Sequence, residues 1–135
     1  PDTALVVEYR TLFENTIVGP WSIAGLASVG DTLFTHRNDL ANAIPLQYRL
    51  VGLNDPVCAA QPHEMVFLQG KNNEEEYTVS LNWSRYKGWE KGVERYEVWR
   101  KMDDENTFTL LRSAGTDTTI ELTDVREGFK HQYRI

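Results

Sequence analysis

The sequence contains a single cysteine and no long hydrophobic run, and each absence excludes a class of protein. Because Cys58 stands alone among 135 residues, no intrachain disulfide can form, and a small disulfide-stabilised scaffold is excluded. No apolar segment approaches the roughly 20 residues that a membrane-spanning helix needs. The first residues lack the basic start and the cleavage site of a signal peptide, so we expect a cytosolic protein or a piece of a larger one.

Positive charge is also scarce. The chain has 14 Lys and Arg against 20 Asp and Glu, which gives a net charge of -6. This balance disfavours binding to nucleic acid or to an anionic lipid surface. The hydrophobic share of 41% and the charged share of 25% are typical of a globular chain with a packed core, so extensive disorder is not expected.

The usual catalytic motifs are missing. His36, His63 and His131 have no second histidine or cysteine at the spacing of zinc ligands. No G-x-S-x-G elbow, P-loop or dinucleotide-binding glycine pattern occurs. Nothing nearby activates Cys58, which we interpret as a small packed residue in a linker, and the acidic turn 103–105 alone supplies too few oxygens for calcium. We therefore expect no catalytic residue, no metal, no cofactor and no enzyme activity.

Patterns of β-strands dominate the rest of the chain. The clearest covers Tyr77–Ser84, whose odd-numbered residues are Tyr77, Val79, Leu81 and Trp83 and are expected to face a core. Further β-rich segments lie at 5–13, 21–26, 32–36, 46–53, 65–68, 95–101, 108–112, 118–122 and 130–135, and turns are predicted between them, including 54–56 and 70–73. Without a convincing amphipathic helix, this pattern predicts an all-β sandwich or barrel.

Four short segments recur in the same order in the two halves of the chain. They are Y-R at 9–10 with W-R at 99–100, W-S-I at 21–23 with F-T-L at 108–110, D-T-L-F at 31–34 with D-T-T-I at 117–120, and Q-Y-R-L at 47–50 with Q-Y-R-I at 132–135. Their shared order indicates two copies of one supersecondary unit. A linker is expected within 55–62, where two prolines flank small residues, and the predicted domains are 1–58 and 59–135.

The second half resembles a fibronectin type III domain. L-N-W at 81–83 matches the family's core tryptophan in strand B, Y-E-V-W-R at 96–100 matches strand C, and L-T-D-V-R-E-G at 122–128 leads into strand F. The stretch Y-K-G-W-E-K-G-V at 86–93 is similar to repeats in very large surface proteins of gliding Bacteroidetes, including gliding motility-associated and type IX secreted proteins. The resemblance implies an immunoglobulin-like β-sandwich of two tandem repeats, with Trp83, Tyr96, Val98, Leu122 and Tyr133 as core residues.

Both repeats depart from this family pattern. The first has strands C to G without A and B, and the second has strands A to F without G. The tyrosine that usually begins strand F is replaced by Leu46 and His131; a histidine can donate to a backbone carbonyl, whereas a leucine can only pack. Exposed sheet edges invite pairing, so we expect strands supplied by a partner chain, a strand-exchanged homo-oligomer, or residues taken from a larger protein.

Exposed aromatic residues provide the candidate binding surfaces. Alternation places Trp99 on the outer side of its strand, where Arg134 would form a cation–π pair with it; the pair either covers the sheet or forms a partner or ligand surface. Trp89, in the loop between strands B and C, is either a plug over the end of the sandwich or an exposed contact. The facing of residues 6–10 stays open, because a slip of one residue inverts every side chain.

The resemblance implies a non-catalytic spacer or adhesion module of a multi-repeat extracellular or cell-surface protein linked to gliding motility, with a protein or a surface glycan as partner. The alternative is a carbohydrate-binding accessory module of a secreted enzyme, in which Trp89 and Trp99 form a stacking platform. A third hypothesis is a small enzyme with an unrecognised site. Neither nucleic acid nor membrane insertion is expected.

Overall fold

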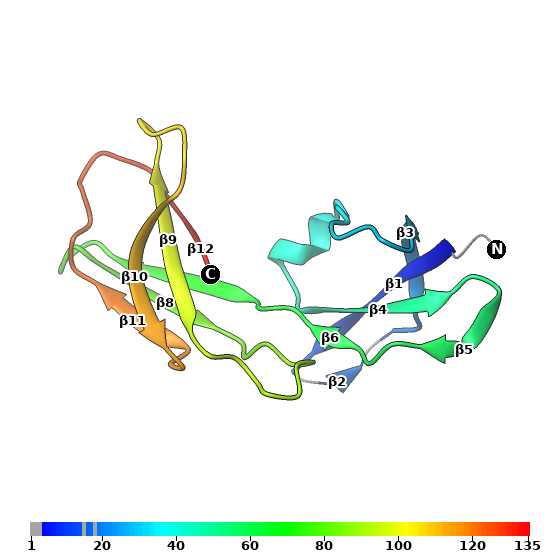
Figure 1. Ribbon diagram of the computed structural model, residues 1–135. Coiled ribbons are helices and arrows are strands. Elements are labelled where there is room, and N and C mark those ends of the chain that lie inside the picture. The colour runs from blue at the N-terminus through cyan, green and yellow to red at the C-terminus, as the bar shows by residue number, and fades with distance from the viewer. Residues whose placement is uncertain (1–3, 15, 18) are drawn as a thin grey trace. The chain divides into compact units, whose positions relative to one another are not determined.

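The computed structural model describes residues 4–14, 16–17 and 19–135, apart from the side chains of residues 42 and 56, and it confirms the all-β class (Figure 1). The described chain forms twelve strands and one short 3-10 helix. Two compact units divide it: unit 1 is Pro1–Phe67 with Tyr86–Glu90, and unit 2 is Leu68–Arg85 with Lys91–Ile135. The division after Phe67 lies beyond the predicted boundary at Cys58, because residues 55–59 of the expected linker form a strand of unit 1 and residues 63–64, just after it, form another.

Unit 1 is a single antiparallel sheet. Its strands are β1 (Ala4–Phe13), β2 (Thr16–Ile17), β3 (Ser22–Ser28), β4 (Leu46–Gly52), β5 (Asp55–Ala59) and β6 (His63–Glu64). The order is β2-β1-β4-β5, with β3 on β1 and β6 on β4. The predicted turn at 54–56 is therefore displaced: the chain turns at Leu53 and Asn54, and β5 begins at Asp55.

The register of β1 settles which side chains share a face. Tyr9 lies opposite Tyr48 and Val7 opposite Leu50, so these four side chains share what we call the inner face. Glu8 lies opposite Arg49 and Arg10 opposite Gln47 on the other side, which we call the outer face. The register left open by the sequence is thus fixed by pairing with β4.

The segment 29–45 covers the inner face of unit 1 without forming a strand. The ring of His36 lies 4.7 Å from that of Tyr9, its Nδ1 is 2.9 Å from the hydroxyl of Tyr48, and Phe34 lies close over Gly25. A 3-10 helix, η1 (Asp39–Asn42), follows, capped by the side chain of Asn38, which accepts from the N–H of Leu40. The prediction of a strand at 32–36 is wrong, because the described residues of unit 1 offer it no neighbouring strand to pair with.

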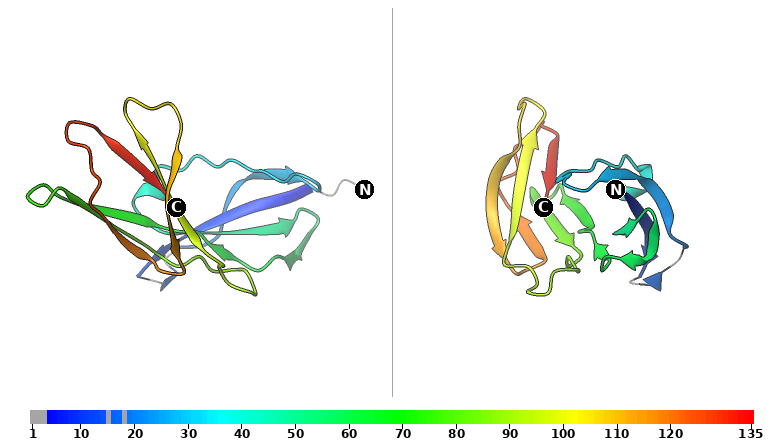
Figure 2. Two further views of the ribbon diagram at one scale, coloured as in Figure 1. Left: turned by 60° about the vertical axis from the view of Figure 1, so that its left-hand side comes forward. Right: turned by 45° about the vertical axis from the view of Figure 1, so that its right-hand side comes forward.

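Unit 2 consists of two three-stranded antiparallel sheets, seen from two further directions in Figure 2. One has the order β11 (Thr119–Leu122), β8 (Thr78–Trp83), β7 (Leu68–Asn73), and the other β10 (Thr109–Gly115), β9 (Tyr96–Met102), β12 (His131–Arg134). The ring of Trp83 in the first sheet lies 5.8 Å from that of Tyr96 in the second. The two sheets of unit 2 therefore enclose a sandwich core between them.

This core contains the residues singled out in the second repeat. Trp83 and Tyr96 are buried, Val98 and Leu122 are completely so, and Tyr133 is half-buried. Leu81 is also buried on β8. Alternating apolar residues on β8 and β9 thus face each other across the two sheets, as the period of two requires.

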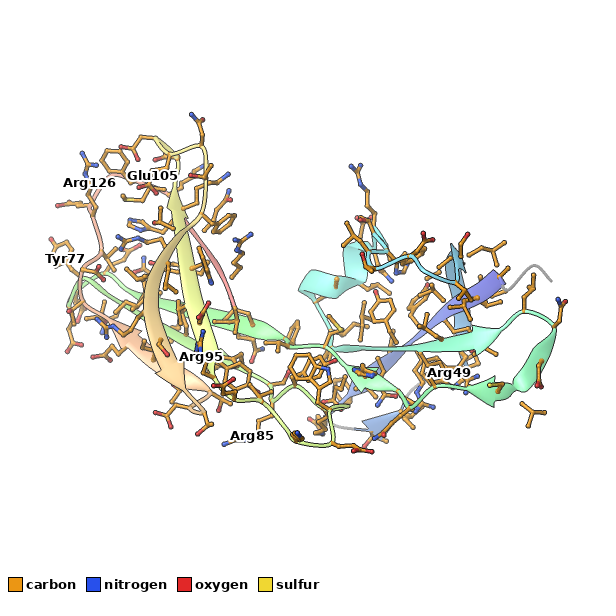
Figure 3. The ribbon with its side chains drawn as sticks, in the orientation of Figure 1. Arg49, Tyr77, Arg85, Arg95, Glu105 and Arg126 are labelled. Carbon is orange, nitrogen blue, oxygen red and sulfur yellow. The ribbon has the colours of Figure 1, made fainter. Side chains whose placement is uncertain are left out.

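The hairpin β7–β8 corrects two expectations. Residues 70–73, predicted as a turn, are strand, and the turn lies at 74–77, where the side chain of Asn73 accepts from the N–H groups of Glu75 and Glu76. Tyr77 has a φ of +52° and is 56% exposed (Figure 3), so it does not face the core. Thr78 is buried instead. The predicted strand at 65–68 also fails, because only Leu68 is in a strand, at the start of β7.

The two units share one arrangement of three strands, β3-β1-β4 in unit 1 and β10-β9-β12 in unit 2. Tyr9 lies opposite Tyr48, and Arg100 lies opposite Tyr133, the residue that repeats Tyr48. Tyr9 therefore corresponds to Arg100, and the sequence match of Tyr9 with Trp99 is wrong by one residue. The position of Trp99 in unit 2 is that of Glu8 in unit 1.

A shared β-bulge supports this equivalence. In unit 1 the register shifts between Val7 and Glu8, and in unit 2 it shifts opposite the corresponding pair, Val98 and Trp99. A bulge leaves one extra residue unpaired and increases the local twist, and its position is a specific feature of a fold. One irregularity thus lies at equivalent positions in the two units, and unit 2 has a further register shift between Ser113 and Gly115.

Candidate functional site

The three histidines serve structural contacts in separate places. His36 lies on the inner face of unit 1, and His63 is hydrogen-bonded to the hydroxyl of Tyr86. The Nε2 of His131 lies 3.0 Å from the carbonyl oxygen of Arg126, so it donates the bond that a histidine at the start of strand F was expected to make. Leu46, at the equivalent position, is buried. Within the described residues no three His, Cys, Asp or Glu side chains gather as metal ligands.

Cys58 and the acidic turn also form no reactive centre. Cys58 is exposed on β5, so its interpretation as a packed linker residue is wrong. In the turn at 103–105, Glu105 accepts from the N–H of Met102 at 2.8 Å, and Asp104 is paired with Arg126 at 3.3 Å (Figure 3). These two carboxylates are used in shaping the turn and holding a neighbouring loop.

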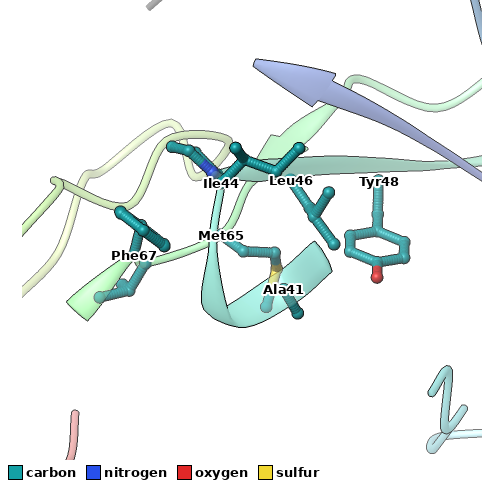
Figure 4. Close-up of a pocket in the computed structure, with 8 residues that line it drawn as sticks. Ala41, Ile44, Leu46, Tyr48, Met65 and Phe67 are labelled. Atoms are coloured by element: carbon teal, nitrogen blue, oxygen red, sulfur yellow. The ribbon is translucent and has the colours of Figure 1, made fainter. Parts of the chain in front are cut away.

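Each unit has a hollow, and the two differ in their lining. The hollow in unit 1, of about 210 Å³, lies between the end of η1 and the chain after β6 (Figure 4). It is lined by apolar side chains with the Tyr48 ring at one side. A wider one in unit 2, of about 400 Å³, lies between the turn at Tyr77 and the segment 125–129.

The outer face of unit 2 carries alternating aromatic rings and cations. The guanidinium carbon of Arg134 lies 5.2 Å from the centre of the Trp99 ring and 4.6 Å from that of Phe108. The ammonium of Lys101 lies 5.5 Å from the same Phe108 ring. Strand pairing causes this arrangement, because Trp99 on β9 lies directly opposite Arg134 on β12. We call these four residues the unit 2 cluster.

The equivalent face of unit 1 carries a related set. Trp21 has the guanidinium carbons of Arg10 and Arg49 each 4.2 Å from its ring centre. Arg49, labelled in Figure 3, forms an ion pair with Glu8 at 2.7 Å, and Arg10 donates to the side-chain oxygen of Gln47 at 2.8 Å. We call these five residues the unit 1 cluster. Sequence reasoning missed it, although the repeated W-S-I and Q-Y-R-L segments held the signal.

The loop at Trp89 forms a third candidate surface. Its backbone pairs with β6, where Glu64 and Lys87 exchange two main-chain hydrogen bonds, and the Lys87 ammonium lies 3.3 Å from the buried Glu64 carboxylate. The Trp89 ring centre lies 4.4 Å from that of Tyr86, with the two planes tilted by 39°, and Trp89 is 59% exposed, so its side chain is not buried as a plug would be. Trp89 belongs to unit 1 and Trp99 to unit 2.

Burial perturbs the acidity of several tyrosines. It raises the pKa of Tyr48, with the neighbouring Tyr9 adding to the effect, and it raises the pKa of Tyr86. Burial also raises the pKa of Tyr133, opposed by the positive charge of Arg100, although no hydrogen bond of normal geometry joins that guanidinium to the Tyr133 hydroxyl. These shifts follow from packing in the two sheets, because a phenolate is poorly solvated there.

The fold and these surfaces define an all-β protein with two related sheet units. No protein-family model matches the chain, and comparison with curated proteins finds no significant match. No helix of the described residues is long and apolar enough to cross a membrane.

Proposed function

We propose that the chain is a non-catalytic structural or adhesion module of a multi-repeat extracellular or cell-surface protein, and that its units are fibronectin type III-like repeats. The observation that carries this proposal is the duplicated three-strand sheet with its bulge at equivalent positions. A repeated unit suits a protein that extends by adding modules.

The strand pairing in unit 2 supports the family assignment. Its sheets β11-β8-β7 and β10-β9-β12 correspond to strands E-B-A and C′-C-F in the sequence comparison with fibronectin type III domains, and Trp83 on β8 takes the place of the core tryptophan. The order β3-β1-β4-β5 in unit 1 corresponds to C′-C-F-G. The resemblance of residues 86–93 to repeats of gliding Bacteroidetes supports a link to gliding motility.

The incompletely covered inner face of unit 1 supports a role in assembly. Leu33 is 83% exposed on the covering segment, and Leu50 is 42% exposed on the inner face itself. Apolar side chains left in this state are typical of surfaces that another strand or chain covers. Strand exchange or a homo-oligomer contact is therefore part of the proposal, and light scattering after gel filtration tests it: a purely monomeric chain at all concentrations would contradict it.

The location is tested on intact cells that produce the protein. We expect an antibody against this chain to label the surface of unpermeabilised cells, and external protease to remove the signal. Labelling that requires permeabilised cells would contradict a cell-surface module. A purified chain that hydrolyses generic glycoside, ester or peptide substrates, at a rate that follows the protein through purification, would contradict the non-catalytic assignment.

A carbohydrate-binding accessory module is the second candidate, favoured by the exposed Trp89 ring on its Tyr86 support. A flat exposed indole held by a hydrogen-bonded loop offers a stacking surface at small entropic cost. If this candidate is right, neutral polysaccharides retard the protein in affinity gels and Trp89→Ala abolishes the retardation. Leu33→Ala, which removes another exposed apolar side chain of unit 1, is the matched control and should leave it unchanged.

A further inference from the structure

The unit 2 cluster has positive charge that the protein does not neutralise. Among the described residues, neither Lys101 nor Arg134 has an ion-pair partner. Arg134 is exposed, and its guanidinium lies against the rings of Trp99 and Phe108. These two cations belong to a chain whose net charge is -6, so the charge of the cluster is opposite in sign to that of the whole chain.

Unit 1 provides an internal comparison for this surface. Glu8 occupies the position that Trp99 has in unit 2, and it neutralises Arg49, which occupies the position of Arg134. Unit 1 thus has the ion pair of Arg49 with Glu8. At the equivalent positions unit 2 has Arg134, without an ion-pair partner among the described residues, beside the ring of Trp99. The residue at this one equivalent position, Glu8 in unit 1 and Trp99 in unit 2, decides whether the arginine opposite it is neutralised.

Its position over two aromatic rings prepares Arg134 to bind an anion. A guanidinium is planar, and when its face lies on a ring its N–H groups remain directed outward along its edge. Those N–H groups match the two oxygens of a carboxylate, and the rings restrict the side chain before a ligand arrives. Lys101 beside Phe108 adds a second cation on the same sheet face.

We infer that the unit 2 cluster binds an anionic polysaccharide whose sugar rings carry carboxylates. Such a polymer presents flat, partly apolar rings and fixed negative charges in alternation, and the cluster presents the complementary sequence of Trp99, Arg134, Phe108 and Lys101. The aromatic rings favour a sugar polymer over an acidic peptide, because stacking rewards a flat ring face. Leu110, 52% exposed opposite Trp99, extends the apolar part of this surface.

The binding test uses the full 135-residue chain and polygalacturonate as the probe, with dextran as the neutral comparison. We expect polygalacturonate to bind and dextran not to bind, and we expect the affinity to fall with added salt because exposed charges are screened. Arg134→Gln should weaken binding about tenfold or more, the loss that a charge-assisted hydrogen bond predicts. Arg49→Gln, the equivalent change in unit 1, should leave binding unchanged.

Trp99→Glu is the decisive variant because it transfers the unit 1 arrangement to unit 2. The new carboxylate would lie opposite Arg134 as Glu8 lies opposite Arg49, and binding should fall at least as far as with Arg134→Gln. Circular dichroism and thermal melting verify that each variant is folded, and Lys101→Gln serves as a second binding variant if Trp99→Glu does not fold.

Several outcomes would overturn the inference. Equal binding of dextran, or equal affinity in Arg134→Gln and the parent chain, would exclude the cluster as an anion site. Stronger binding of polyglutamate than of polygalacturonate would assign the surface to acidic peptides. The inference deepens the proposed adhesion role and rests on it for biological context, but the cell-surface labelling experiment can fail while polygalacturonate still binds, so the two failures are distinguishable.

Discussion

The two units carry the same three-strand sheet and differ in what lies against its inner face. In unit 2, β9 faces β8 of a second sheet, and Val98 is completely buried. In unit 1, the equivalent face is covered by the irregular segment 29–45, and Leu33 and Leu50 remain exposed. The comparison teaches that a strand depends on its neighbours: β11 pairs with β8, while its sequence counterpart near Leu33 has no partner strand and remains irregular.

Removing the Trp83 side chain should have the largest effect, because it leaves a cavity between the two sheets of unit 2, whereas unit 1 has a single sheet. We expect Trp83→Ala to cost about 3 to 5 kcal/mol, the range for truncating a large buried aromatic residue, which is comparable to the whole stability of a small sandwich. Urea unfolding followed by circular dichroism should show the transition of unit 2 lost and that of unit 1 retained.

Two further variants control the Trp83 experiment. Trp83→Phe should cost less, because the indole N–H has no hydrogen-bond partner among the described residues and most of the ring volume is kept. Asn82→Ala, on the exposed side of the same strand, should be nearly neutral. A Trp83→Ala protein that melts within a few degrees of the parent chain would refute the placement of this residue in the core.

Gly88→Ala should break the loop that belongs to unit 1. Gly88 has a φ of +135°, and a Cβ there would lie 2.6 Å from Nδ1 of His63. We expect a loss of about 1 to 3 kcal/mol, the cost of a residue forced into a disfavoured backbone region, together with faster hydrogen exchange at the Glu64 and Lys87 amides.

Gly92→Ala, further along the chain in unit 2, is the control for backbone strain alone. Its φ of +71° is also positive, but nothing lies within 4 Å of the added Cβ, so only the backbone preference is lost, at about 1 kcal/mol. Urea unfolding measures the loss of stability in both variants. Equal losses would show that the clash of the added Cβ at position 88 with His63 has no energetic role.

The equivalent tyrosines should respond differently to loss of the hydroxyl. Tyr48→Phe leaves His36 without its 2.9 Å hydrogen bond and should cost about 1 kcal/mol. Tyr133→Phe removes a buried hydroxyl that has no hydrogen-bond partner among the described residues, and should be neutral or slightly stabilising. Thermal melts of both variants measure this difference, and a larger loss in Tyr133→Phe would contradict it.

Alkaline pH should have the smallest effect on the free energy of unfolding, and it should act on both units. Burial raises the pKa of Tyr48 and of Tyr133, so the folded protein keeps protons that the unfolded chain releases near pH 10. The stability is therefore fully present below about pH 10 and falls as pH rises through the folded-state pKa values. The slope of unfolding free energy against pH between 9 and 11 should flatten in Tyr133→Phe, and an unchanged slope would contradict the assignment of that proton.

Much of unit 2 and part of the candidate surface could be predicted from sequence. The alternation at Val79, Leu81 and Trp83 identified β8, and alternation on the two neighbouring strands placed Arg134 beside Trp99. The prediction that Tyr77 faces the core failed because periodicity alone does not show where a hairpin turns. The turn at 74–77 depends on the pairing of Asn73 with Thr78. The unit 1 cluster was not predicted because Arg10 on β1, Arg49 on β4 and Trp21 just before β3 are brought together by a strand register that the sequence left undetermined.

The sequence by itself determined the all-β class, the duplication and the apolar pattern of β8 and β9, because these follow from local alternation and from turn-forming residues. Only the tertiary structure decided which face of β1 points inward, that the chain near Leu33 is not a strand, and that Arg49 is neutralised while Arg134 is not. Those outcomes depend on backbone hydrogen bonds and charges contributed by residues distant in sequence, and a one-residue change of register reverses them.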